Sequence, residues 1–373
     1  MNVMRPALRY YGAKWLLAPV ILELIGSHEV YVEPYGGSAA VLLRKRERSL
    51  LEVYNDLDVE VVNFFFVLRE MADEFISLVD STPFSLDEFT RAQNYTSPPA
   101  YHTSSSSVSC VSSSASCSSS SVSCSSSLSD ISLSFSLSLL RELVESGEDL
   151  KSVRLKGSHT GRRKRKNSYR SPAVTVVPQK TRLKGSHASK HIRRCLEAAR
   201  LFYIRSYLGI SGPTSTWNTG FRRQKIFSRG RNGQKMMSPA AQTFTKTDHI
   251  LPLRDRLRGV TIDNLDAIEC IEKYDSPQTL FYVDPPYPAD VRERKSGYRH
   301  EMSLDDHRRL LQVLNKVRGQ VILSSYESLL YATGLEGWAR KEKEMRINGS
   351  GSAVEVIWMN EAAAAARPQM RLL

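Results

Sequence analysis

Short, largely apolar runs recur in the first and last parts of the chain, and each run stops at a polar residue, a glycine or a proline. Runs of this length are typical of strands in a parallel sheet, which are buried on both faces. Apolar residues at helical spacing follow most of the runs, for example over residues 58–69 and 305–317. The predicted strands are residues 30–32, 50–54, 260–262, 280–283 and 321–323.

Strands that alternate with helices predict an α/β fold built on a parallel sheet. Parallel strands present their carboxyl ends on the same side, so the polar residues that end them gather along one edge. Open sheets of this kind bind ligands outside those ends. The pattern therefore predicts the position of a functional site before any motif is considered.

The composition of the chain divides it into segments of different character. Residues 1–96 have ordinary globular proportions, whereas 22 of the 36 residues from Thr103 to Ser138 are serine. Serine adds little apolar surface and competes for backbone hydrogen bonds, so we expect this tract to be disordered. Helical spacing of apolar residues returns near His191. The predicted segments are 1–96, a serine-rich and then basic insertion at 97–190, 191–257, 258–360 and a tail at 361–373.

Charge is distributed unevenly along the 373 residues, which carry a formal net charge of +13. Residues 151–235 contain 23 Lys or Arg and a single acid, Glu197, and such a segment usually faces a polyanion. No apolar run reaches the ~18 residues of a membrane span, and the N-terminus has no signal sequence. Three of the five cysteines lie in the serine tract, which argues against a disulfide framework. We therefore expect a cytoplasmic protein that does not bind membranes.

A glycine-rich loop, Glu33-Pro34-Tyr35-Gly36-Gly37-Ser38, follows the first predicted strand. Glycine permits the sharp turn and close approach that a nucleotide-type cofactor requires, although a plain turn is the alternative. Asp56 ends the second predicted strand, where an acid in cofactor-binding α/β folds accepts the ribose hydroxyls. The alternative role for Asp56 is the N-cap of the helix predicted at 58–69.

The sequence Asp284-Pro285-Pro286-Tyr287 follows the fourth predicted strand. Its chemistry suits an exocyclic purine amine, which is a poor nucleophile because its lone pair is conjugated into the ring. A carboxylate and a backbone carbonyl can accept the two N–H bonds and favour the positive charge that develops during attack. The prolines stiffen the backbone, and the tyrosine offers a face on which an extruded base can stack. The alternative is a strand-ending turn with a surface tyrosine.

Four blocks together resemble the Dam-like DNA adenine N6-methyltransferases, which use S-adenosylmethionine. The blocks are residues 9–14 (Arg-Tyr-Tyr-Gly-Ala-Lys), 33–38, 55–58 and 284–287, in the family's order. The last block is identical to the family's catalytic motif, whereas the glycine loop departs from the more usual Phe-x-Gly-x-Gly. The resemblance covers roughly residues 5–95 and 190–360. It implies a Rossmann-like class I methyltransferase sheet with an inserted target-recognition region, to which this chain adds the low-complexity insertion.

The same resemblance implies roles for individual residues. S-adenosylmethionine would lie across the glycine loop with its ribose on Asp56, and no metal would take part. Lys14 would meet the methionine carboxylate of the cofactor or steady the loop. A flipped adenine would stack on Tyr287, with its N6 amine held by Asp284 and the Pro285 carbonyl. The implied catalytic residues are Asp284, Pro285, Pro286 and Tyr287. The implied cofactor-binding residues are Tyr10, Lys14, Glu33, Pro34, Tyr35, Gly36, Gly37, Asp56 and Asp284.

Basic residues interleaved with aromatic ones between residues 200 and 235 predict a surface that grips phosphates and probes base edges. A solvated charged face would normally include acids, and Glu197 is the only acid nearby in the sequence. The predicted contacts to double-stranded DNA are Arg205, Trp217, Arg222, Arg223 and Lys225. The insertion at 97–190 either adds affinity for DNA or is translated sequence that does not belong to the mature protein.

Several alternatives stay open at this point. Adenine in RNA and N4 of cytosine in DNA also offer a conjugated exocyclic amine, and the chain could instead be a catalytically inactive nucleic-acid binder. A cognate restriction endonuclease is a candidate partner. We expect the protein to be a monomer.

Overall fold

The computed structural model describes residues 3, 5–95, 187–210, 212–213, 220–222, 228–229, 235–236, 239–288, 291, 297–346 and 352–367. Apart from the start of one helix, these residues belong to a single unit formed by residues 1–103 and 193–373. Most of the insertion predicted at 97–190 therefore lies outside the described residues. So do three of the predicted DNA contacts, Trp217, Arg223 and Lys225.

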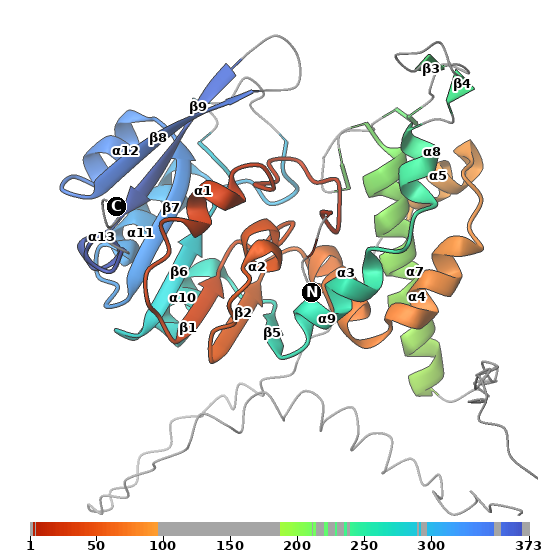
Figure 1. Cartoon of the computed structure of the whole chain (residues 1–373), viewed down its shortest axis with the longest axis horizontal. Coiled ribbons are helices and arrows are strands. Elements are labelled where there is room, and N and C mark those ends of the chain that lie inside the picture. Colours follow the sequence, from red (N-terminus) through yellow and green to blue (C-terminus); the bar gives the residue numbers. More distant parts are fainter. Residues whose placement is uncertain are drawn as a thin grey trace, which may run out of the picture. The chain divides into compact units, whose positions relative to one another are not determined.

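A seven-stranded sheet forms the core of this unit, in the order β5-β2-β1-β6-β7-β9-β8 (Figure 1). Neighbours from β5 to β7 are parallel, and β9 is antiparallel to both β7 and β8. The predicted α/β fold with a Rossmann-like sheet is confirmed. The strands are β1 (Val30–Glu33), β2 (Leu51–Asn55), β5 (Val260–Asp263), β6 (Thr279–Val283), β7 (Gln320–Tyr326), β8 (Ala339–Arg346) and β9 (Ser352–Met359).

Helices cover both faces of the sheet. Successive strand residues point to opposite sides, so the apolar strands present side chains that must be buried on each face. Tyr31 packs in a cluster on one face and Val32 in a second cluster on the other. The first cluster includes side chains from α1 (Ala18–Leu22), α2 (Ala40–Arg44), α3 (Val59–Glu70), α9 (Ile250–Leu257) and α13 (Glu361–Ala365). The second includes side chains from α10 (Ala267–Tyr274), α11 (Leu304–Leu314) and α12 (Leu329–Gly334).

The chain between β2 and β5 forms a mainly helical region on one side of the sheet (Figure 1). Aromatic rings hold its helices together: Phe75 packs edge-on against Phe64 and Tyr203, with centroids 5.9 and 5.6 Å away. No helix within the described ranges has both the length and the apolar character of a membrane span. Besides α3 and α9, the region contains α4 (Ala72–Asp80), α5 (Leu86–Gln93), α7 (His187–Leu208), α8 (Pro239–Phe244), β3 (Ser228–Arg229) and β4 (Lys235–Met236).

The elements differ from the sequence prediction in four places. The helix expected from about His191 already begins at His187, and β7 continues to Tyr326 instead of stopping before Ser324. The strands β8 and β9 were not predicted. The edge strand β8 contains five consecutive charged residues, 340–344, which hide its pattern. Part of the predicted tail is the short helix α13, whose N-cap Asn360 accepts a hydrogen bond from the Ala363 N–H.

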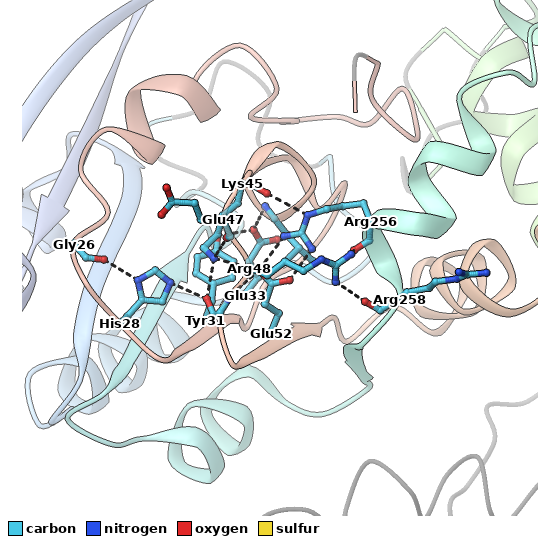
Figure 2. A network of polar contacts seen from close by, with 12 residues as sticks. Gly26, His28, Tyr31, Glu33, Lys45, Glu47, Arg48, Glu52, Arg256 and Arg258 are labelled. Carbon is cyan, nitrogen blue, oxygen red and sulfur yellow. Dashed lines mark hydrogen bonds and ion pairs between the residues drawn. The ribbon is translucent and has the colours of Figure 1, made fainter. Parts of the chain in front are cut away.

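A buried ionic network fastens the helical region to the sheet at the start of β2 (Figure 2). Glu52 on β2 accepts hydrogen bonds from both Nη atoms of Arg256 on α9, at 2.6 and 3.0 Å. Lys45 Nζ lies 3.2 Å from the same carboxylate, and Arg48 donates to two carbonyls at the end of α9. Burial would raise the pKa of Glu52, but the hydrogen bonds from Arg256 hold it below its usual value. The network fixes α9 at the end of β2 opposite to its carboxyl end.

Replacing Arg256 with alanine tests this anchor. We expect Arg256→Ala to lower the free energy of unfolding by about 3–5 kcal/mol, because Glu52 would keep a buried charge without its main partner. The measurement is urea unfolding followed by circular dichroism. Arg308→Ala is the control, because its ion pair with Asp305 is largely exposed and should contribute little. Equal losses in the two variants would contradict the role given to the network.

Candidate functional site

The strand order reverses between β1 and β6. From β1 the chain adds β2 and β5 on one side, whereas β6 is followed by β7 on the other. The connections leave such a point in opposite directions and open a crevice beyond the carboxyl ends of the strands. Glu33 ends β1 and Asp284 directly follows β6, so the topology brings the glycine loop and the 284–287 motif to the same crevice.

A cavity of about 330 Å³ occupies this position, and its size lies within the range of small-molecule sites. Asp284 and Pro286 of the predicted catalytic motif line it, whereas Pro285 and Tyr287 are buried and are not among its lining residues. The predicted cofactor-binding residues that line the cavity are Tyr10, Lys14, Glu33, Pro34, Tyr35, Gly36, Gly37, Asp56 and Asp284.

Close packing explains why two glycines occupy the loop after β1. A Cβ on Gly36 would lie only 2.2 Å from the ring of Tyr54, and Gly37 has a φ of +48°, which disfavours other residues. The Gly36 N–H donates to the Asn55 carbonyl at 2.7 Å, and the Gly37 N–H donates to Asp56 Oδ2 at 2.7 Å. The loop is therefore held tightly against the end of β2.

Asp56 faces the cavity and is not the N-cap of α3. That cap is Asp58, whose side chain accepts the Glu60 N–H at 2.9 Å. Asp56 instead accepts the N–H groups of Gly37 and Asp58, one on each carboxylate oxygen. Burial raises the pKa of Asp56 to about 6, although these backbone hydrogen bonds oppose the rise. Each oxygen retains a lone pair for a hydroxyl group in the cavity.

Glu33 is 2% exposed and lies at the start of the glycine loop. One carboxylate oxygen, Oε1, accepts both the Tyr31 hydroxyl at 2.8 Å and the Leu42 N–H at 2.7 Å. Burial raises the pKa of Glu33 to about 8, against the effect of these two hydrogen bonds. The side chain therefore ties β1 to α2 and is largely protonated at neutral pH.

Two groups hold the carboxylate of Asp284 through the same oxygen. Ser324 Oγ on β7 donates to Oδ1 at 2.8 Å, and Lys14 Nζ lies 3.0 Å from it. Lys14 also donates to the Gly12 carbonyl at 3.0 Å. Burial disfavours the charge on Lys14, but Asp284 and then Glu355 raise its pKa above the usual value, so it stays a cation. Within the described part of the chain, Oδ2 of Asp284 has no hydrogen-bond partner.

Tyr287 is buried beside this ion pair and is held on three sides. Its hydroxyl donates to Glu355 Oε2 at 2.5 Å. The ring of Tyr326 meets it edge-on with centroids 4.7 Å apart, and Lys14 Nζ lies 4.6 Å from its centroid. Glu355 was missed by sequence reasoning, because it belongs to the unpredicted strand β9 and no motif marks it.

The segment 297–302, which follows the catalytic motif, lines another side of the cavity. Tyr298 packs against the ring of Tyr11, and Arg299 forms ion pairs with Asp58 at 3.1 Å and Glu60 at 2.6 Å. Both carboxylates belong to the buried start of α3. The two ion pairs therefore fasten the segment over the cavity.

The two described residues among the predicted DNA contacts have different surroundings. Arg205 is only 12% exposed in its side chain, and its Nη2 lies 2.5 Å from Glu60 Oε2. Its charge is thus neutralised inside the helical region, and the structure gives no support for a phosphate contact there. Arg222 is partly exposed, and burial together with the charge of Arg9 lowers its pKa. An anion near Arg222 would relieve that repulsion.

Comparison with known proteins gives one match. Residues 10–109 match the family model of the D12 class N6 adenine-specific DNA methyltransferases. The matched range begins at Tyr10 and includes Lys14, the glycine loop and Asp56, whereas the motif at 284–287 lies beyond it. No curated protein sequence matches the chain significantly.

Glu33→Gln tests the buried carboxyl of the glycine loop. The pKa of Glu33 rises from its usual 4.5 to about 8 on folding, so its contribution to stability is complete below pH ~4.5 and is lost as the pH rises through about 8. A glutamine oxygen can accept the same two hydrogen bonds without this loss. We expect wild type to lose a few kcal/mol relative to Glu33→Gln between pH 5 and pH 9. Urea unfolding across this range measures the difference, and a constant difference would contradict the prediction.

Proposed function

We propose, from the match of residues 10–109 to the family model of the D12 class N6 adenine-specific DNA methyltransferases, that this chain methylates an adenine flipped out of duplex DNA with S-adenosylmethionine as donor. One observation carries the proposal. The carboxylate of Asp284 lines the same cavity as the glycine loop and Asp56, although more than 200 residues separate them in the sequence. The acceptor for the target amine and the elements suited to a nucleoside cofactor are therefore neighbours.

The described residues fit S-adenosylmethionine. Gly12, Gly36 and Gly37 lie where a Cβ would meet Tyr298, Tyr54 and Tyr10, so side chains larger than glycine would crowd the cradle. Asp56 has lone pairs available for the ribose hydroxyls, as the family resemblance implies. When bound, the cofactor supplies a methyl group activated by a sulfonium.

The contacts of Lys14 support a role that differs from the two that the sequence predicted, which were to meet the methionine carboxylate of the cofactor and to steady the glycine loop. Its Nζ contacts the Gly12 carbonyl and Asp284, which ties the N-terminal block to the catalytic motif. The resulting ion pair, together with the hydrogen bond from Ser324, fixes Oδ1 of Asp284. This leaves Oδ2 to accept one N–H of the target amine, with the Pro285 carbonyl as the second acceptor.

The proposed chemistry then depends on position and charge. The N6 lone pair is delocalised into the ring, and the amine would acquire positive charge as its bond to the methyl carbon forms. The bond between that carbon and the sulfonium would break in the same step, S-adenosylhomocysteine would leave, and the methylated amine would then lose one proton. A fixed carboxylate stabilises that charge more effectively than water, because it needs no reorganisation during the step. Holding both reactants in one cavity removes most of the entropic cost of bringing them together. The segment 297–302 would exclude water from the same space.

Other parts of the proposal rest on the sequence. Arg222, together with Trp217, Arg223 and Lys225, stays a predicted contact to DNA, whereas we leave Arg205 out because of its ion pair with Glu60. A cognate restriction endonuclease, a monomeric state and a cytoplasmic location also stay predictions.

Asp284→Ala provides the main test. We expect wild type to transfer labelled methyl from S-adenosylmethionine to duplex DNA and to yield N6-methyladenine after digestion to nucleosides. Asp284→Ala should lose transfer at least 1000-fold, because the developing charge loses its carboxylate. Binding of S-adenosylhomocysteine, measured by calorimetry, should stay within about threefold of wild type.

Controls separate this proposal from its rivals. Asp305→Ala removes an acid that is 83% exposed and should retain full activity. N4-methylcytosine as the product, or transfer to RNA in place of DNA, would support one of the alternative substrates. An active Asp284→Ala enzyme would remove the proposed role of Asp284, and DNA binding by wild type without transfer would support an inactive binder.

Arg299→Ala tests the cover of the cavity. Loss of both ion pairs should free the segment 297–302 and raise the KM for S-adenosylmethionine by about tenfold, equivalent to ~1.4 kcal/mol. The effect on kcat should be smaller, because Arg299 does not contact the catalytic carboxylate. Steady-state kinetics with saturating DNA provides both constants, and Arg308→Ala again serves as the control. An unchanged KM would show that the ion pairs do not hold the cofactor site closed.

A further inference from the structure

A second carboxylate lies next to the catalytic motif, and the chemistry proposed above does not use it. Glu355 on β9 is only 8% exposed. Because β9 is antiparallel to β7, the beginning of β9 reaches the edge where β6 and β7 end, and Glu355 pairs in register with Tyr326. A buried carboxylate is costly unless its oxygens find partners. The partners of Glu355 therefore indicate what it does.

The first partner of Glu355 is the tyrosine of the catalytic motif. The Tyr287 hydroxyl donates to Oε2 at 2.5 Å, which is short for a hydrogen bond between two oxygen atoms. The rest of the ring is held by contacts that are not directional hydrogen bonds: the edge of Tyr326 and the ammonium of Lys14. The bond to Glu355 therefore sets the direction of the hydroxyl end of the ring.

The second partner is Lys14, through its charge. Asp284 and Glu355 both stabilise the Lys14 ammonium. Burial raises the pKa of Glu355, and the Lys14 charge opposes this rise without cancelling it. The same ammonium lies 3.0 Å from Asp284 and 4.6 Å from the Tyr287 centroid. Glu355 is thus connected with two of the four motif residues, with Tyr287 by a hydrogen bond and with Asp284 through the charge of Lys14.

We infer that Glu355 is a positioning residue for methyl transfer, which holds the ring of Tyr287 in the orientation that a stacked target adenine requires. This inference rests on the proposed function. Glu355 acts through the Tyr287 hydroxyl, so its loss changes the reaction of the bound base and not the binding of the cofactor. A base stacks on an aromatic ring only if the two planes are parallel and in contact. The orientation of the Tyr287 ring should therefore affect the rate of methyl transfer.

Four variants of the full chain test this inference: Glu355→Ala, Glu355→Gln, Tyr287→Phe and the double variant Glu355→Ala with Tyr287→Phe. The assay measures kcat and the KM for S-adenosylmethionine, with labelled methyl transfer into plasmid DNA. Glu327→Ala is the matched control, because this neighbouring acid is 55% exposed and forms its ion pair with Arg340 on the surface. Thermal unfolding of each variant reports changes in stability separately.

We expect Glu355→Ala and Tyr287→Phe each to lower kcat at least tenfold and to change the KM for the cofactor less than threefold. The double variant should be no slower than the slower single variant, because both changes remove the same hydrogen bond. Glu355→Gln should recover most of the rate lost in Glu355→Ala, since an amide oxygen can accept the tyrosine hydroxyl. Glu327→Ala should behave as wild type.

Other outcomes overturn the inference. A wild-type kcat in Glu355→Ala, or multiplicative losses in the double variant, would show that Glu355 does not act through Tyr287. If Glu355→Ala fails to fold, Tyr287→Phe breaks the same bond from the other side, and its unchanged kcat would be equally decisive. Wild type that transfers no methyl to DNA would overturn the proposed function itself, whereas active wild type with unaffected variants would overturn only the role of Glu355.

Discussion

A lysine ammonium buried near two carboxylates is the interaction on which the candidate site depends. Lys14 precedes the first strand, Asp284 follows β6 and Glu355 lies on β9, so the three charges come from distant parts of the chain. Each charge alone would be costly to bury, and the loss of one partner would leave the others uncompensated. The complete set is therefore possible only when the N-terminal block, the parallel strands and the antiparallel strand are all in place. The site can therefore form only when the whole sheet and the N-terminal block have assembled.

The sequence was sufficient to predict the half of the site that local patterns encode. Five parallel strands are marked by apolar runs, and their polar ends include Asp56 and Asp284. Glu355 could not be found in this way, because it lies on β9. The charged sequence of β8 does not indicate that β8 is an edge strand and pairs with β9. Only an antiparallel strand can bring its first residues to the edge where parallel strands end. Topology, which the local sequence does not encode, decided whether this carboxylate belongs to the site.

The basic residues of α7 show the same limit on what can be predicted from neighbouring residues in the sequence. The segment around Arg200 and Arg205 contains almost no acids, and this absence led to the prediction of a surface for DNA. In the folded chain other helices supply further acids: Glu88 on α5 pairs with Arg200, which also pairs with Glu197 on its own helix, and Glu60 on α3 pairs with Arg205. Glu60 also accepts Arg299 through the same oxygen, Oε2. Two guanidinium groups that share one acceptor weaken each other, so the position of α7 and the cover of the cavity are electrostatically connected.

The contacts between α5 and α7 also explain how the fold can accommodate the chain between them. Arg200 on α7 bonds to Glu88 on α5 at 2.7 Å, and Asn63 on α3 donates through Nδ2 to the Cys195 carbonyl of α7 at 3.0 Å, so α5 and α3 both hold α7 in place. The cost of closing a loop grows only with the logarithm of its length. Extending a connection from ~10 to ~90 residues adds about 2 kcal/mol, which is comparable to one charged hydrogen bond of the kind that joins these helices. The packing of α5 and α7 is therefore determined by their own contacts. The helical region can form whether residues 97–190 add affinity for DNA or do not belong to the mature protein.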